Sequence, residues 1–184
     1  MAQVRTKGSA VNAAARDLRA AAAPPRRALL ILAVTIALLL AARSLVAEPF
    51  AIPTESMQPT LRPGDQVLVD KLSYRLGDPA RDDLAAFREV GGDRVQLKRI
   101  VGLPGDRVAI EDGVLVVNGR PRREAYVDHS RIDSVYFGPV TVPTGSYFVL
   151  GDNRGNSRDS RDYGAVARRD MLGRVLFRLW PLSR

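Results

Sequence analysis

The chain of 184 residues has no cysteine and a single histidine, His129. Disulfides, thiolate metal sites and a cysteine nucleophile are therefore excluded, and so is a zinc site built on several imidazoles. Lysine is scarce as well, because only Lys7, Lys71 and Lys98 occur among the 28 basic residues and the others are arginine. Arginine stays protonated in proteins, whereas a buried lysine can lose its proton. Each lysine is thus a candidate for chemistry, and we expect no metal and no cofactor.

Acidic residues are scarce near the N-terminus. Six basic side chains against Asp17 alone give residues 1–27 a charge of +5, which leaves +3 of the total of +8 for residues 28–184. No compact basic patch alternates with aromatic residues after this segment, and no DNA-binding or RNA-binding motif occurs. We therefore expect no nucleic acid partner, although the sequence pI is near 10.5.

Long apolar runs are absent except for one. Residues 28–42 are apolar or neutral, and past Arg43 the run extends to Ala47, which is close to the roughly 20 residues that a spanning helix needs. The basic residues before it predict a cytoplasmic N-terminus. We expect a cytoplasmic tail (1–27), a transmembrane signal-anchor helix (28–47) and an extracytoplasmic domain (48–184) on the cell membrane. A cleaved signal peptide is the alternative, but the apolar core is long for one and the site before Glu48 is a poor match.

The remainder of the chain reads as short strands and turns, without a long amphipathic helix. The segment 65–71 alternates, and 107–120 places Asp112-Gly113 between two apolar runs, followed by the turn signal Asn118-Gly119. The segments "GSYFVLGD" and "GRVLFRLW" read as two more strands. We therefore predict a mainly β domain, a sandwich or open barrel, behind the N-terminal helix.

The stretch "PTESMQPTL" (53–61) presents Ser56 as either a turn residue or a nucleophile. A nucleophilic serine needs a base. His129 is flanked by polar residues and is interpreted as a surface residue. Lys98, in "VQLKRIVGLPGD" (95–106), lies on a predicted strand with apolar neighbours. To act as a base it needs a pKa lowered from about 10.4 to near 8, which corresponds to about 3 kcal/mol. A solvent-exposed edge-strand lysine is the alternative.

A third segment, "GDNRGNSRDSRDYG" (151–164), alternates Asp and Arg after a predicted strand. It does not fit the calcium-loop template, because Arg154 stands at a ligand position and Gly155 comes too early. A rigid loop with internal ion pairs that supports a site is at least as good an interpretation as a plain solvated loop.

These three segments, in this order, resemble those of the bacterial type I signal peptidases, which are membrane-bound serine proteases. "AEPFAIPTESMQPTLRPGDQVLVDK" resembles the nucleophile box, "LKRIVGLPGD" the lysine box and "GDNRGNSRDSRDYG" the C-terminal box of that family. The resemblance extends over residues 28–184, and its end, "LFRLWPLSR", is similar to the family's last strand. It implies a signal-peptidase-like β domain that removes signal peptides with small residues at −1 and −3 from exported preproteins at the membrane lipid.

The resemblance also implies roles for individual residues. Ser56 corresponds to the nucleophile and Lys98 to the general base. Thr54 corresponds to the residue that completes the oxyanion hole, and Ser157 to the one that orients the lysine. The remaining positions match a structural pair and the substrate pockets: Asp159 with Arg161, and Ile52, Met57, Leu61 and Leu97.

Two positions depart from the family pattern. Glu55 stands beside the nucleophile, and Asp82 replaces a glycine of a family strand. Two other functions stay open from the residues: a peptidase dedicated to a narrow set of substrates, and an inert anchored domain that binds exported peptides. A self-cleaving repressor relative would need an N-terminal DNA-binding domain, for which residues 1–27 are too few. The inert domain predicts that Lys98→Arg is harmless.

Overall fold

The computed structural model describes residues 26–128, 132 and 136–181, and for residues 41–45 it describes the backbone only. His129 lies outside the described residues. The chain divides into two compact units, residues 1–43 and 44–184, which we describe separately.

The first unit contains most of helix α2 (Arg26–Val46). The helix coincides with the apolar run of the sequence, and its large apolar side chains are exposed, with Leu30 at 68% and Leu38 at 65%. No helix among the described residues is both long enough and apolar enough to cross a membrane. The transmembrane helix expected from the sequence therefore stays a prediction.

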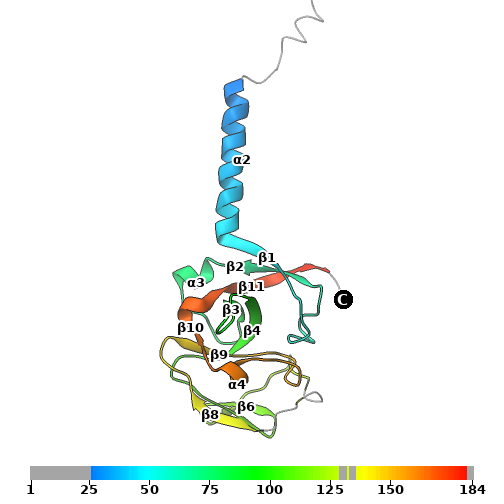
Figure 1. The fold of residues 1–184 in the computed structure, drawn as a ribbon, viewed down its shortest axis with the longest axis vertical. Coiled ribbons are helices and arrows are strands. Elements are labelled where there is room, and N and C mark those ends of the chain that lie inside the picture. Colours follow the sequence, from blue (N-terminus) through cyan, green and yellow to red (C-terminus); the bar gives the residue numbers. More distant parts are fainter. Residues whose placement is uncertain (1–25, 129–131, 133–135, 182–184) are drawn as a thin grey trace, which may run out of the picture. The chain divides into compact units, whose positions relative to one another are not determined.

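The second unit is mainly β, as predicted (Figure 1). Its larger sheet has seven described strands in the order β1-β2-β11-β3-β4-β9-β10 and curls into an open half-barrel. Its strands are β1 (Ala47–Ala51), β2 (Gln66–Asp70), β3 (Leu84–Arg88), β4 (Val95–Gly102), β9 (Ser146–Leu150), β10 (Val166–Ala167) and β11 (Met171–Trp180). All neighbours in this sheet pair antiparallel. Strand β4, which carries Lys98, is interior, because β3 and β9 flank it.

The smaller sheet has four described strands in the order β7-β6-β5-β8. They are β5 (Arg107–Glu111), β6 (Val114–Val117), β7 (Arg120–Pro121) and β8 (Phe137–Thr141). The predicted hairpin is present, since β5 and β6 pair antiparallel around Asp112 and Gly113, whose φ angles are +49° and +76°. Asn118 and Gly119 form the next turn, also with positive φ. The turn signals of the sequence thus located the β5–β6 and β6–β7 connections of this sheet correctly.

Helices are short in the described part of this unit. They are α3 (Ser73–Leu76), α4 (Ser160–Tyr163) and the 3₁₀ turn η2 (Arg168–Asp170). Asp159 is the N-cap residue of helix α4: its side chain accepts from the Arg161 N–H, and the Asp162 carboxylate accepts from the Asp159 N–H. This reciprocal cap holds the end of the polar segment 151–159 in one conformation.

Three apolar clusters form the core. One of them, which contains Val67, Ala86 and Leu97, also includes Ile52, Met57 and Leu61 from the segment that carries Ser56. Met57 and Leu61 are 1% and 4% exposed. Burying side chains of this size is worth roughly 1.5–3 kcal/mol each. The segment that carries Ser56, although it is not a strand, is therefore anchored in the core.

Candidate active site

Ser56 lies in a loop that is fixed at both ends by backbone hydrogen bonds. The Ile52 N–H donates to the Asp65 carbonyl at 2.8 Å, and the Gly64 N–H donates back to the Ile52 carbonyl at 2.9 Å. Within the loop, the Gln58 N–H donates to the Glu55 carbonyl at 3.0 Å. These bonds hold a tight turn around Ser56, which is 8% exposed. The two interpretations of Ser56, as a turn residue or as a nucleophile, are therefore compatible, because a residue of a turn can present its side chain to a substrate.

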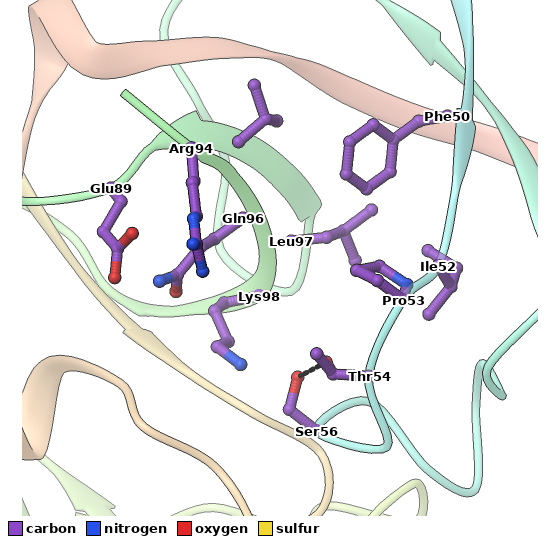
Figure 2. Close-up of a pocket in the computed structure, with 11 residues that line it drawn as sticks. Phe50, Ile52, Pro53, Thr54, Ser56, Glu89, Arg94, Gln96, Leu97 and Lys98 are labelled. Carbon is purple, nitrogen blue, oxygen red and sulfur yellow. Dashed lines mark hydrogen bonds between the residues drawn. The ribbon is translucent and has the colours of Figure 1, made fainter. Parts of the chain in front are cut away.

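Thr54 points toward the same space as Ser56. Its Oγ1 lies 3.1 Å from the Ser56 Oγ, and either hydroxyl can donate in this pair (Figure 2). The side chain of Glu55 is directed elsewhere, because its carboxylate accepts a hydrogen bond from the Asn156 Nδ2 at 3.3 Å. The carboxylate that departs from the family pattern is thus engaged with the 151–157 loop.

Lys98 is buried on β4, with 4% of its surface exposed. Its ammonium end points toward the Ser56 hydroxyl (Figure 2). Burial is the main influence on the pKa of Lys98, which falls from 10.5 to about 8. Nearby charges act in both directions: Asp159, Asp152 and Asp162 raise this pKa, and Arg161 lowers it. The buried state replaces the alternative of a solvent-exposed edge lysine.

Asp159 holds the 151–161 loop together through its carboxylate. It is fully buried, and its Oδ2 accepts from the Gly151 N–H at 3.0 Å and from the Ser157 hydroxyl at 2.8 Å. Its Oδ1 pairs with the Arg161 Nε at 2.9 Å. The Arg161 Nη2 also donates to the Arg154 carbonyl at 2.7 Å. The loop is thus held by internal ion pairs and hydrogen bonds.

Ser157 contacts Asp159 rather than the lysine. Among the described residues no hydrogen bond joins Ser157 to Lys98, and the Ser157 hydroxyl donates to the Asp159 carboxylate. Since Asp159 is the charge that most raises the pKa of Lys98, Ser157 is linked to the lysine only through that carboxylate. Its predicted role in orienting Lys98 stays a prediction.

A pocket of about 360 Å³ lies in front of Ser56 and Lys98. Its apolar lining includes Ile52 and Leu97, two of the four predicted substrate contacts. Met57 and Leu61, the other two, are not part of its lining and belong to the apolar core below the loop. The other lining residues are Phe50, Pro53, Thr54, Glu89, Arg94, Val95 and Gln96. In Figure 2, Phe50, Ile52 and Pro53 lie on one side of Lys98, and Glu89, Arg94 and Gln96 lie on the other.

Sequence reasoning missed the ionic network behind the site. The Arg99 Nη2 and Nε contact the two Asp152 carboxylate oxygens at 2.6 and 2.9 Å, and the Thr60 hydroxyl donates to the Asp152 Oδ2 at 2.5 Å. Arg154 pairs with the buried Glu124 at 2.6 Å. Apart from the Asp and Arg residues of the 151–164 segment, no signal could have found these pairs, because the partners are 30 to 53 residues apart.

Comparisons with known proteins identify the family of the chain. Residues 26–180 match the family described as signal peptidase, peptidase S26. The chain is 42% identical over 148 residues to a probable signal peptidase I-2 of Synechocystis sp., which covers 77% of this chain and 67% of that one. It is 39% identical over 158 residues to the signal peptidase I of Leptolyngbya laminosa, at 82% and 77% coverage.

Among solved structures, a signal peptidase I from Enterococcus faecalis V583 is 34% identical in sequence. The superposition covers 55% of this chain and 98% of that one, with a TM-score of 0.48.

Among the described residues, no group of three or more acidic or histidine side chains could hold a metal ion.

Proposed function

This chain belongs to the signal peptidase family, peptidase S26, and we propose that it removes signal peptides from exported preproteins with Ser56 as the nucleophile and Lys98 as the general base. It is a serine endopeptidase of the signal peptidase I type. The observation that supports these two roles is one pocket lined by both a serine hydroxyl and a buried lysine with a pKa of about 8. A serine hydroxyl becomes a nucleophile only when a nearby base accepts its proton.

The reaction proceeds by acyl transfer. The Ser56 Oγ attacks the scissile carbonyl carbon while the neutral Lys98 Nζ takes the hydroxyl proton, and a tetrahedral oxyanion forms. The C–N bond then breaks, and Lys98 returns the proton to the leaving amine. Water attacks the resulting ester on Ser56, with Lys98 again accepting a proton, and the serine is regenerated. A lysine suits this cycle, whereas an arginine does not, because an arginine stays protonated.

The oxyanion is stabilised by two donors in this proposal. They are the Ser56 N–H and the Thr54 hydroxyl, which is within 3.1 Å of the attacking oxygen in the resting structure. Preorganised donors of this kind are each worth about 10²–10³ in rate. Because Thr54 contacts Ser56 Oγ before the reaction, its hydroxyl needs only to rotate toward the new negative charge.

The substrate side chains enter the apolar half of the pocket. We expect small residues at positions −1 and −3 of the signal peptide, as the resemblance to the signal peptidases implies. Ile52, Leu97, Phe50 and Pro53 offer apolar walls in the pocket of about 360 Å³ against which such side chains can pack. No metal takes part in this scheme, since the lysine supplies the base.

Helix α2 anchors the protein in the cell membrane in this proposal. The apolar run of residues 28–47 supports it, and so do the exposed apolar side chains of the helix, since a helix that is apolar all round needs lipid or protein around it. Residues 1–27 form the cytoplasmic tail, and residues 48–184 form the extracytoplasmic peptidase domain that contacts membrane lipid.

The first experiment is cleavage of a preprotein by the purified full-length chain in detergent, with Ser56→Ala and Lys98→Arg as variants. We expect the wild-type protein to release a fragment after a small residue and both variants to lose at least about 10³-fold in kcat/KM, because the nucleophile or the base is missing. Wild-type activity of Lys98→Arg would exclude Lys98 as the base. A silent wild-type protein on several preproteins would favour the inert peptide-binding domain or a peptidase dedicated to a narrow set of substrates.

A further inference from the structure

Asn153 connects the 151–157 loop to the nucleophile loop through two hydrogen bonds. Its backbone N–H donates to the Ser56 carbonyl at 3.1 Å, and its side-chain Nδ2 donates to the Glu55 carbonyl at 3.2 Å. The side chain is buried, with 5% exposed. One residue therefore holds the carbonyl groups of two successive residues, one of which is the nucleophile.

The Glu55 carbonyl and the Ser56 N–H belong to the same peptide group. A peptide group is planar, and in its trans form the C=O and N–H point in opposite directions. The Glu55–Ser56 bond is trans, since the cis bonds of the described residues all precede proline. A donor that fixes the direction of the Glu55 carbonyl thus fixes the direction of the Ser56 N–H as well.

The Ser56 N–H is available to a substrate. Among the residues that the structure describes, it has no hydrogen-bond acceptor. On the other side of the peptide group, the Glu55 carbonyl has two donors, the Asn153 amide and the Gln58 N–H at 3.0 Å. The Gln58 bond lies within the turn itself. The Asn153 bond instead fixes the orientation of the Glu55–Ser56 peptide plane relative to the 151–161 loop, which also contains Asp159.

We propose that Asn153 is a positioning residue that orients the Glu55–Ser56 peptide group so that the Ser56 N–H points at the oxyanion of the tetrahedral intermediate. This inference rests on the proposed peptidase function. Hydrogen-bond donors stabilise a developing charge well only when they are already aligned, because no reorganisation is then needed during the reaction. Asn153 supplies that alignment without touching the substrate.

The amide is the group that this role requires. Aspartate has the same shape, but its ionised carboxylate has no donor and would place two negative oxygens against the Glu55 carbonyl. Alanine removes the side-chain bond and leaves the backbone N–H bond to Ser56 in place. Asn156→Ala is the matched control, since its amide contacts only the Glu55 carboxylate, at an exposed position.

The test measures kcat and KM separately for the full-length protein in detergent, with a fluorogenic signal-peptide substrate, over a range of pH. For Asn153→Ala and Asn153→Asp we expect kcat to fall about 10- to 100-fold with KM within about threefold of wild type. For the alanine variant, we expect the pH at which kcat is half-maximal to stay near the pKa of Lys98, about 8. The inhibition constant of a peptide aldehyde, whose adduct with Ser56 carries an oxyanion, rises in parallel. Asn156→Ala stays within about twofold of wild type.

Several results would overturn the inference. They are a kcat within about twofold of wild type in both Asn153 variants, a loss confined to KM, a displaced pH midpoint in the alanine variant, or thermal unfolding of both variants at the assay temperature. The same assay separates this inference from the proposed function. A silent wild-type protein refutes the function, whereas an active wild type with an inactive Ser56→Ala variant and active Asn153 variants refutes only the role of Asn153.

Discussion

Lys98 is held in an environment that favours its neutral form. Its side chain is 4% exposed on an interior strand, and burial lowers its pKa to about 8. The carboxylates of Asp159, Asp152 and Asp162 oppose this shift, but Asp159 is itself paired with Arg161 and Asp152 with Arg99. The aspartates near the base are thus largely compensated, so burial prevails.

Activity should follow the deprotonation of Lys98. With a pKa of about 8, only about one-tenth of the molecules hold a neutral lysine at pH 7, so kcat/KM should rise about tenfold per pH unit below that value. It should reach half its maximum near pH 8 and level off above about pH 9. Initial rates on a substrate without ionisable groups near the cleavage site provide the measurement. A flat profile between pH 6 and 9 would contradict the assignment.

The contribution of Lys98 to the free energy of unfolding should also increase with pH. The folded-state pKa of Lys98 lies below the unfolded value of 10.5, so the unfolded chain binds more protons between these values. The contribution of Lys98 to the free energy of unfolding therefore rises with pH from about 8 to 10.5 and is unfavourable below that window. Lys98→Met, while inactive, should thus raise the free energy of unfolding by about 1–3 kcal/mol at pH 7. Denaturant unfolding at pH 7 measures this difference. Lys71→Met, which replaces a partly exposed lysine, is the control.

At the level of single residues, the sequence pointed to Ser56 and Lys98, whose catalytic roles stay predictions, and it missed the residues that contact and support them. Ser56 and Lys98 stood out because their neighbours combine turn residues or apolar residues with a reactive group. Arg99 gave no such signal, because the strand register alone does not reveal that its guanidinium meets Asp152, 53 residues away. Asn153 was hidden for the same reason, since its partner Glu55 is 98 residues away.

Among the elements, the 151–161 loop contacts the loop that carries Ser56 directly, since the Asn153 N–H donates to the Ser56 carbonyl. Gly151 makes this approach feasible, because a Cβ on this residue would overlap the Ser157 hydroxyl and lie 2.5 Å from both the Ser157 Cβ and the Ser56 carbonyl oxygen. The Gly151 N–H also donates to Asp159. The absence of a side chain at one position therefore lets two loops pack backbone against backbone.

Gly151→Ala should separate these two loops. We expect at least about a 100-fold loss of kcat and a free energy of unfolding lower by about 1–3 kcal/mol, because the added methyl group has no space and backbone must move. Gly77→Ala is the control, since its Cβ would meet only the Ser73 carbonyl, at 3.7 Å. Steady-state kinetics and thermal unfolding of both variants give the answer. Wild-type kinetics for Gly151→Ala would show that the loops tolerate separation.

Elements with local signals were predictable. The turns at Asp112-Gly113 and Asn118-Gly119 fixed the hairpin and its neighbour, because they need positive φ angles that these residue types accept. Alternation was less informative for β4, where every residue from Leu97 to Gly102 is buried. A strand covered on both faces loses the period of two by which exposure is inferred. The order of the strands in either sheet also had no local signal.

For the whole molecule, the proposal places its two units in different surroundings. The apolar run and the basic residues before it predict one crossing, with the N-terminus inside and the peptidase domain outside. Among the described residues, the apolar side chains of α2 are exposed over its length from Leu29 to Leu40. These features motivate a test of topology in intact cells.

An epitope tag at residue 2 should be protected from protease added outside spheroplasts, whereas a tag after residue 184 should be digested. Positively charged residues next to a spanning helix are retained in the cytoplasm, which gives this orientation. Immunoblots before and after lysis provide the measurement, and digestion of both tags after lysis is the control. An N-terminal tag that is digested in intact spheroplasts would reverse the topology. Loss of that tag during membrane insertion would instead indicate a cleaved signal peptide.

The contact of Asp152 with both Arg99 and Thr60 has a consequence for the ionic conditions under which the protein works. Arg99 follows Lys98 on β4, and Thr60 belongs to the loop that carries Ser56, so the Asp152 carboxylate links the segments that hold these two residues. Its side chain is 1% exposed, and an ion pair buried in this way is screened by dissolved salt much less than an exposed pair. We therefore expect the alignment of Ser56 and Lys98 to change little with ionic strength.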